Sequence, residues 1–407
     1  MLLVDMRSPA PRHTTDIAVG YVTAPATDPA GILEKVGAGL QTYFPQYSWC
    51  LLNSPDGPPA AFTWRGEPSR ASGYRNLLRA AQRMKASVCL IVDPDEHGFE
   101  SNWVDALVRP GIHSRHDLVT PVYSTSAREQ LISRNLLSPM LGALFGRGPA
   151  QPMPGEFLLS ARVVDHLLER PDWDSEPARH APELWMSFVT AAEHFRLAET
   201  AVGPSARVTS GPPLSRQMRI GQIVGSLLTL MEGSEGRWVL PPAAPELDRF
   251  GQAVTIERAS ARYDGLSYMA HFVDVFPALR SEWQYLLDVA TFTETESLYL
   301  AWREGDTDRG MGPAVWVSLV YQFAAAWKRR RLPRGQVAGL FTALWLARAG
   351  SFLMKTQWKE NAEVEAELKR LDGFFLALKP EMERRWKVQN AKKSNPASAL
   401  MARQRAA

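Results

Sequence analysis

Cysteine is scarce in this chain of 407 residues, which contains only two, Cys50 and Cys89. Each lies in an apolar stretch, so we interpret both as buried structural thiols rather than as a disulfide or a metal-binding pair. The sequence also lacks a Cys/His spacing typical of zinc, a Ser/His/Asp nucleophile set and a phosphate-binding loop. These absences argue against zinc, nucleophile-triad and phosphate-loop chemistry.

An excess of one charge and a long apolar run are absent as well. Lys and Arg number 46 and Asp and Glu 43, and the formal net charge of +3 is no nucleic-acid signature. Residues 1–12 have no long apolar core after a basic start, as a signal peptide would. The longest nearly uncharged helical stretches, Val315–Trp327 and Gly335–Ala347, are too short to span a bilayer comfortably. We therefore expect a cytoplasmic protein with no transmembrane segment and no nucleic-acid partner.

The pattern of apolar residues changes once along the chain. Strand and helix signals alternate through about residue 210, which favours an α/β fold with a parallel, doubly wound sheet. From Pro277 onward only helical periodicity stands out, and most of the thirteen tryptophans lie in this C-terminal half, where they would fill a helical core. We predict a sheet domain over 12–215, a connecting helix and loop over 216–260, an all-helical domain over 261–388 and a disordered basic tail over 389–407.

The sheet should be organised around Val88–Asp95. Five apolar residues run without a break and end at Asp93 and Asp95, which flank Pro94. Such a run is typical of a strand buried on both faces of a parallel sheet, and ligands bind beyond the carboxyl ends of such strands. Two carboxylates there can hold a hard divalent cation, which in turn holds phosphates. The alternative is an ordinary Asp-Pro-Asp turn with both side chains solvated.

Six local signatures follow one another along the chain. They are Asp16-Ile17-Ala18-Val19-Gly20, Asn53-Ser54-x-Asp56-Gly57, Val92-Asp93-Pro94-Asp95, Thr120-Pro121-Val122-Tyr123, Gln151-Pro152-x-x-Gly155-Glu156-Phe157 and Glu183-Leu184-Trp185-Met186. With them the chain resembles retaining glycosyltransferases of the A-type (GT-A) fold, in particular the glucosylglycerate and mannosylglycerate synthases. The resemblance implies a Rossmann-like nucleotide-diphospho-sugar transferase fold followed by an all-helical domain. It also implies transfer of a sugar from a nucleotide-diphosphate donor to a small anionic acceptor such as glycerate.

The resemblance further implies roles for individual residues. For the donor and its metal, Mg²⁺ or Mn²⁺, the residues are Asp95 and Asp93 as metal ligands, and Thr23, Asn53, Asp56, Asp93 and Arg207 around the nucleotide. For catalysis and the acceptor, they are Glu156 and Glu183, and Ser133, Arg134 and Asn135. Each group also has a plain structural interpretation: an Asx turn, a carboxylate at a helix N-terminus, or a capping Ser beside an exposed Arg.

The chain departs from the family pattern where the metal and the donor would bind. The family's Gly-Lys is Gly73-Tyr74 here, and no His lies between Gly203 and Gly211, where one usually completes the metal site. Arg207 falls about there and could neutralise phosphate directly, so the metal could be dispensable. We therefore carry two hypotheses, a glycosyltransferase and a catalytically weakened relative that binds nucleotides or sugars or acts as a scaffold.

Two contacts with partners are left open. The basic run Lys328–Arg334 is typical of a solvated helix end, but it could also meet an anionic membrane surface. The helical domain could form a homodimer.

Overall fold

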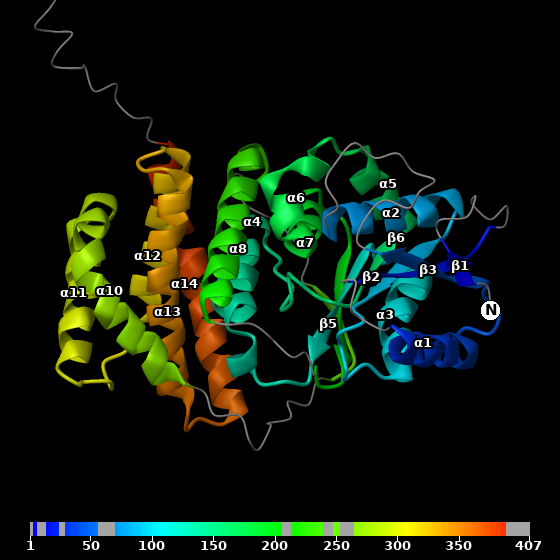
Figure 1. The fold of residues 1–407 in the computed structure, drawn as a ribbon, viewed down its shortest axis with the longest axis horizontal. Coiled ribbons are helices and arrows are strands. Elements are labelled where there is room, and N and C mark those ends of the chain that lie inside the picture. The colour runs from blue at the N-terminus through cyan, green and yellow to red at the C-terminus, as the bar shows by residue number, and fades with distance from the viewer. Residues whose placement is uncertain are drawn as a thin grey trace, which may run out of the picture.

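The computed structural model describes residues 3–5, 14–23, 29–55, 70–205, 213–238, 247–252 and 264–387. The chain forms two halves that lie side by side, a sheet covered by helices and a stack of long helices (Figure 1). This agrees with the predicted α/β Rossmann-like fold followed by a helical region. The tail predicted to be disordered, 389–407, lies outside the described residues.

The sheet, among the described residues, has eight strands in the spatial order β1-β3-β2-β4-β6-β5-β7-β8. Their bounds are β1 Leu3–Asp5, β2 Ile17–Thr23, β3 Trp49–Pro55, β4 Val88–Val92, β5 Leu118–Tyr123, β6 Phe157–Ser160, β7 Leu197–Val202 and β8 Asp248–Phe250. The predicted central strand β4 is buried over its whole length. Two strands lie outside the predicted sheet domain: β1 precedes residue 12, and β8 comes from the segment expected to be only a connection.

The sheet is mainly parallel, as predicted, and one strand runs against the others. β6 pairs antiparallel with both β4 and β5, and Ile91 lies opposite Phe157. The other pairings are parallel. Because β6 is antiparallel, its first residue lies at the edge where its neighbours end. Glu156, which precedes β6, is therefore next to the end of β4.

Helices cover both faces of the sheet, and the strand alternation supplies both cores. Val88, Leu90 and Val92 pack on the face covered by α1 (Ala30–Tyr43) and α3 (Ser101–Ser114). Cys89 and Ile91 point to the opposite face, which is covered by α2 (Arg70–Arg83), α5 (Ala161–Glu169) and α7 (Pro182–Ala192). The core on this second face continues without a break into the helical half.

The two helices on the first face approach closely at a glycine. A Cβ atom at Gly39 of α1 would lie 2.4 Å from the backbone oxygen of Ser101, at the start of α3. Only glycine allows this crossing without a shift of the backbone.

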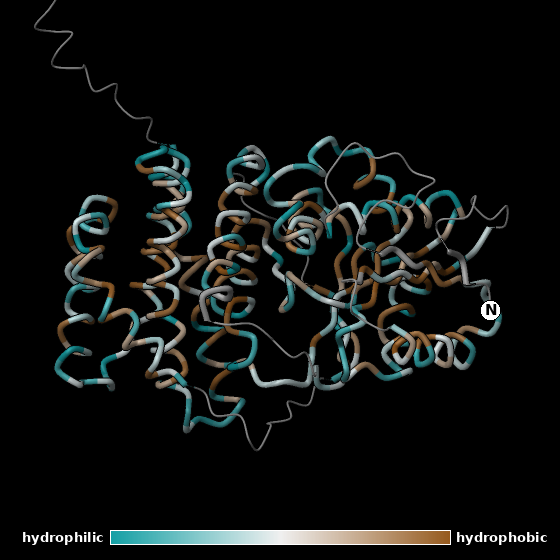
Figure 2. Tube along the Cα trace, viewed as in Figure 1, coloured by the Kyte–Doolittle hydropathy of each residue, from teal (hydrophilic) through white to brown (hydrophobic). Residues whose placement is uncertain are grey.

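The helical half contains the long helices of the chain. They are α8 (Pro213–Gly233), α10 (Gly265–Leu286), α11 (Val289–Arg303), α12 (Pro313–Lys328), α13 (Arg334–Thr356) and α14 (Asn361–Lys387). α10 passes through Pro277 and begins at Gly265, upstream of the point from which helical periodicity stands out in the sequence. Hydrophobic residues run along the strands and the helices, and the turns between helices are hydrophilic (Figure 2). The predicted tryptophan core is present, with Trp238, Trp283, Trp316, Trp327 and Trp386 buried.

One of these helices is longer than the sequence led us to expect. α13 extends over 23 residues and, by length and composition, could cross a membrane. In the structure, 83% of its most hydrophobic window is buried, and α13 packs against α8, α10 and α12. Its apolar character is thus used inside the protein.

A π-helical turn, Ser133–Leu137, joins the two halves. The side-chain oxygen of Asn135 accepts a hydrogen bond from Nη2 of Arg348 at 3.0 Å, and its backbone oxygen accepts one from the Trp316 indole at 2.9 Å. Arg348 is buried, and its Nη1 donates to the Met311 backbone oxygen at 2.9 Å. A buried guanidinium is tolerated only with partners of this kind. The turn is therefore a structural joint between α12, α13 and the sheet half.

The two thiols test the packing of the sheet. Burial raises the pKa of Cys50 to about 11 and that of Cys89 to about 12. Because the thiolate is the reactive form, we expect neither to react with a thiol reagent in the folded protein at about pH 8. Both should react after unfolding in guanidinium chloride. A reaction of the thiol reagent with the native protein would contradict the burial of these strands.

The joint is tested by two neighbouring substitutions. Asn135→Ala removes the acceptor of a buried guanidinium, and we expect it to lower the free energy of unfolding by about 1–3 kcal/mol. The control is Arg134→Ala, because Arg134 forms only a partly exposed ion pair with Glu365 at 2.5 Å. That change should cost about 0–1 kcal/mol. Urea unfolding followed by circular dichroism measures both, and equal losses would refute the joint.

Candidate functional site

The stretch after β4 forms the turn that the sequence offered as the alternative to a metal site. Oδ1 of Asp93 accepts a hydrogen bond from the backbone N–H of Asp95 at 3.0 Å, and the Glu96 N–H donates to the Asp93 backbone oxygen at 3.0 Å. The side chain of Asp93 is buried, whereas Asp95 is exposed. The two aspartates therefore differ in environment, and Asp93 is the one fixed by its surroundings.

Asp93 belongs to a charged cluster around Arg70, the first residue of α2. Nη2 of Arg70 lies 3.6 Å from Oδ2 of Asp93, and its Nε lies 2.9 Å from Oε1 of Glu183, without the alignment of a hydrogen bond. Glu183 is the main cause that holds the pKa of Arg70 well above its usual value, so the guanidinium is always charged. Glu183 stands in the first turn of α7. Two of the predicted carboxylates are thus brought together by a cation that the sequence analysis missed.

A tyrosine completes this cluster from the next turn of α2. The Tyr74 hydroxyl donates to Oε1 of Glu183 at 2.7 Å, and Nη2 of Arg70 donates to the same hydroxyl at 3.3 Å. Burial holds the pKa of Tyr74 well above its usual value, so the hydroxyl keeps its proton and remains a donor. The Glu183 carboxylate is therefore held in one orientation from two sides.

Glu156 lies at the same edge of the sheet but is turned to the other face. Its Oε2 accepts a hydrogen bond from the Tyr123 hydroxyl at 2.5 Å, and the residue is fully buried. Tyr123 ends β5, and its ring contacts the Trp103 ring of α3, with centroids 5.8 Å apart. Asp93, after the end of β4, and Glu156, before the start of β6, therefore lie at the same edge of neighbouring strands. That both line one cleft stays a prediction.

A further buried carboxylate extends this edge. Glu96 is buried, and its Oε1 and Oε2 accept hydrogen bonds from the Gly98 N–H at 2.8 Å and from the Ser205 hydroxyl at 2.5 Å. The sequence pointed to its neighbours in Asp-Pro-Asp but not to Glu96 itself. Glu96 ties the turn after β4 to the segment after β7.

The remaining predicted residues divide into two groups. Thr23 ends β2 and Asn53 lies two residues before the end of β3, at this same edge, and the structure describes their backbone but not their side chains. Asp56 and Arg207 lie outside the described residues. Of the predicted acceptor residues, Ser133 is buried, while the side chains of Arg134 and Asn135 bind the helical half. The structure thus places Thr23, Asn53 and Asp93 at or near strand ends and the acceptor residues at the joint.

The aspartates do not fit a divalent cation held by the protein alone. Asp93 is already engaged by the Asp95 N–H and by the Arg70 guanidinium. Within the part of the chain that the structure describes, no group of three His, Cys, Asp or Glu side chains could hold a metal ion. Mg²⁺ can be held by one or two carboxylates when phosphates supply the other ligands, but here Asp95 alone is exposed.

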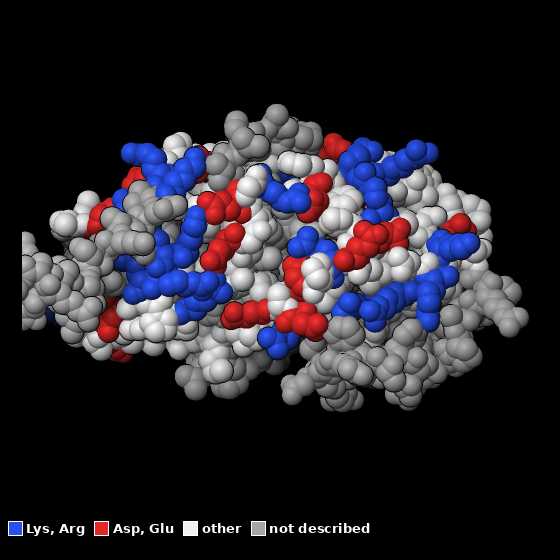
Figure 3. All heavy atoms as spheres, turned by 90° about the horizontal axis from the view of Figure 1, so that it is seen from above, with Lys and Arg blue, Asp and Glu red and all other residues white. Residues whose placement is uncertain are grey.

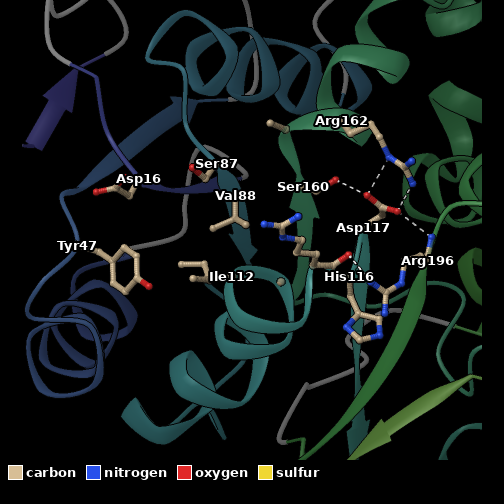
Figure 4. Close-up of a pocket in the computed structure, with 13 residues that line it drawn as sticks. Asp16, Tyr47, Ser87, Val88, Ile112, His116, Asp117, Ser160, Arg162 and Arg196 are labelled. Carbon is tan, nitrogen blue, oxygen red and sulfur yellow. Dashed lines mark hydrogen bonds and ion pairs between the residues drawn. The ribbon is translucent and has the colours of Figure 1, made fainter.

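The clearest cavity among the described residues lies elsewhere, at the N-terminal edge of the parallel strands. It has a volume of about 520 Å³. Figure 4 shows Asp117 on one wall, where its carboxylate binds Arg162 and also accepts from the Arg196 N–H at 2.8 Å. On the other side, Asp16 accepts a hydrogen bond from the Ser48 hydroxyl at 2.7 Å. Because these charges satisfy each other and no predicted residue is present, we do not assign the candidate site to this cavity.

The basic run after α12 makes contacts within the chain. Lys328 binds Glu235 at 2.7 Å, and both Arg330 and Arg334 form ion pairs with Glu232. On the face shown in Figure 3, acidic side chains lie among the Lys and Arg side chains. These pairs account for the run without a membrane, and a membrane contact stays a prediction.

Comparisons with known proteins find a likeness only among solved structures. No family model and no curated protein matches the chain. Two structures of glucosyl-3-phosphoglycerate synthase from Mycobacterium tuberculosis are similar, one in complex with Mn²⁺, UDP-glucose and phosphoglyceric acid and one with phosphoglyceric acid. The first is 16% identical with a TM-score of 0.37, and the second 17% with 0.35. Each match covers 56% of this chain and 82% of the other. A likeness this distant carries no conclusion on activity.

The tyrosine contact can be tested by removing one oxygen atom. Tyr74→Phe takes a hydrogen bond from the buried Glu183 carboxylate, and we expect it to lower the free energy of unfolding by about 1–3 kcal/mol. The control is Tyr285→Phe, because Tyr285 is 49% exposed. It should leave stability unchanged in the same urea titration. A loss confined to Tyr285→Phe, or no loss for Tyr74→Phe, would show that the cluster is not held in this way.

Proposed function

We propose that the protein binds a nucleotide-diphosphate sugar at the C-terminal edge of β2, β3 and β4 and transfers the sugar to a small anionic acceptor such as glycerate. One observation carries the proposal: Asp93 and Glu183, from separate parts of the chain, meet around Arg70 at the edge where α/β sheets bind ligands, and Glu156 lies at the same edge on the other face of the sheet. Burying carboxylates is costly, and such groups concentrate at functional sites. The sequence resemblance supplies the class of ligand.

The residues suit the binding of a hydroxylated ligand. Carboxylates accept hydrogen bonds from sugar and ribose hydroxyls, and the tyrosines that bind Glu183 and Glu156 fix the directions of the carboxylate oxygens. We assign Asp93 to the ribose and Glu183 to the transferred sugar. Glu156 would act from the β6 side after a local movement, because in this structure it is fully buried. Retention of configuration belongs to the proposal and rests on the resemblance alone.

The acceptor residues need to be reassigned within this proposal. Asn135 holds Arg348 and Arg134 holds Glu365, so their side chains are already in use. Ser133, at the start of the same turn, is the third predicted acceptor residue and remains our candidate for binding the acceptor carboxylate.

The second candidate is a binding protein without transferase activity. Two observations favour this candidate: Asp93 is paired with Arg70, and Glu156 is completely buried. Both are acids that a transferase would use, and here the protein itself engages them. Ligand binding alone does not separate the candidates. Sugar transfer does.

The proposal predicts a specific gain in thermal stability. UDP, GDP, UDP-glucose and GDP-glucose should be tested with Mg²⁺, with Mn²⁺ and with a chelator. A ligand that binds only the native state raises its stability by about 2.7 kcal/mol at 100 times Kd. We expect one base to be preferred, with binding weakened about tenfold or more by Glu183→Gln. The distant Glu193→Gln is the control.

Transfer is measured on the same samples by the release of nucleotide diphosphate with glycerate or phosphoglycerate present. Release that depends on the acceptor identifies a transferase. Binding without release identifies the second candidate. Absence of binding for every nucleotide, with and without metal, would refute both.

A further inference from the structure

The guanidinium of Arg70 occupies the centre of the proposed site. It lies within 3.6 Å of Oδ2 of Asp93 and 2.9 Å of Oε1 of Glu183, so one cation faces the end of β4 and the start of α7 together. The two side chains are only 9% and 6% exposed, whereas that of Arg70 is 38% exposed. Of the three groups, the cation is the one that solvent reaches.

Carboxylates in such a position require a compensating positive charge. Removing two neighbouring negative charges from water is costly, and a cation close to both offsets this cost together with their mutual repulsion. Either a divalent ion or a fixed guanidinium can provide that charge. Here a guanidinium does so, and it lies beside Oδ2 of Asp93, the oxygen that the turn hydrogen bond leaves for a cation.

We propose that Arg70 replaces a divalent cation at this edge of the sheet, so that the protein binds its ligand without a metal ion. The description of the ligand as a nucleotide-diphosphate sugar rests on the proposed function, but the replacement itself does not. Three observations on the described residues carry it: the paired carboxylates, the turn hydrogen bond that occupies Oδ1 of Asp93, and the lack of a third metal-ligating side chain grouped with them.

A purely structural ion pair would behave differently. If Arg70 only stabilises α2 against α7, its removal costs stability and nothing more. If it stands in the place of a metal ion, its removal takes the guanidinium away from the paired carboxylates of Asp93 and Glu183, with Asp95 nearby in sequence. Hard oxygen ligands of this kind bind Mn²⁺ or Mg²⁺. The variant should therefore gain an affinity for metal that the native protein lacks.

The test uses MnCl₂ without nucleotide, followed by electron paramagnetic resonance of the free ion. We expect the full-length wild type to leave the free Mn²⁺ signal unchanged. Arg70→Ala should bind Mn²⁺ at least about tenfold more tightly than the wild type. Arg70→Lys, which keeps the charge, should behave like the wild type.

Two further variants locate the new site. Arg70→Ala combined with Asp93→Asn should lose the gained affinity, because one of the two carboxylates is gone. Arg134→Ala, which also removes one arginine from an ion pair with a glutamate, should gain none. Because Arg70→Ala could be unstable, the melting temperature is measured in parallel. Mn²⁺ should raise it for Arg70→Ala and leave it unchanged for the wild type.

Two results would overturn the proposal. One is tight Mn²⁺ binding by the wild type that Asp93→Asn abolishes, since Arg70 would then not exclude the ion. The other is an Arg70→Ala variant that neither binds Mn²⁺ nor is stabilised by it. Both are obtained without nucleotide, so they are independent of the proposed function. If the protein binds no nucleotide, the proposed function fails while the result on Arg70 stands.

Discussion

The structure of the sheet edge depends on the pairing of buried acids with donors. Parallel strands end at one edge, and the reversed direction of β6 adds the residue before its own start to that edge. Acids that arrive there must each find a donor or a cation within the protein. Arg70 and Tyr74 pair with the acids on the α2 face, and Tyr123 donates a hydrogen bond to Glu156 on the α3 face. Polar groups from both faces of the sheet, the α2 face and the α3 face, thus lie at one edge.

The two halves of the chain are coupled through that same arrangement. Leu77 of α2 and Trp316 of α12 belong to one continuous hydrophobic cluster, and Asn135 adds polar contacts across the boundary. The helical half therefore packs against the same hydrophobic core as α2, which carries Tyr74, and α7, which carries Glu183. A continuous set of packed side chains therefore connects α12 and α13 with the elements that carry Tyr74 and Glu183.

Much of the fold could be predicted because periodicity is a local signal. The apolar run Val88–Val92 and the helical repeats after Pro277 reveal strand and helices directly. The direction of β6 could not be predicted, since four residues carry no mark of whether they pair parallel or antiparallel. The start of α10 was missed because helical periodicity stands out only from Pro277 onward, while the helix itself begins at Gly265 and continues through this proline.

The site was predictable only where acids end a strand pattern. Asp93 follows β4 visibly, but its cation does not: Arg70 comes from a segment without periodicity, and its contact with Glu183 spans more than a hundred residues. Asn135 was predicted to bind a ligand because a polar residue at a helix start resembles an anion site. Its partner, Arg348, is in α13 and could be found only from the fold.

The packing of α13 has a consequence for synthesis of the protein. This helix is apolar enough to be read as membrane-spanning, and its packing partners α8, α10 and α12 all precede it in the chain. Domains form from the N-terminus as the chain leaves the ribosome. By the time α13 emerges, the surface that receives it has already been made, and the segment can be buried at once. The order of the helices thus shortens the time in which the hydrophobic helix α13 is exposed to solvent.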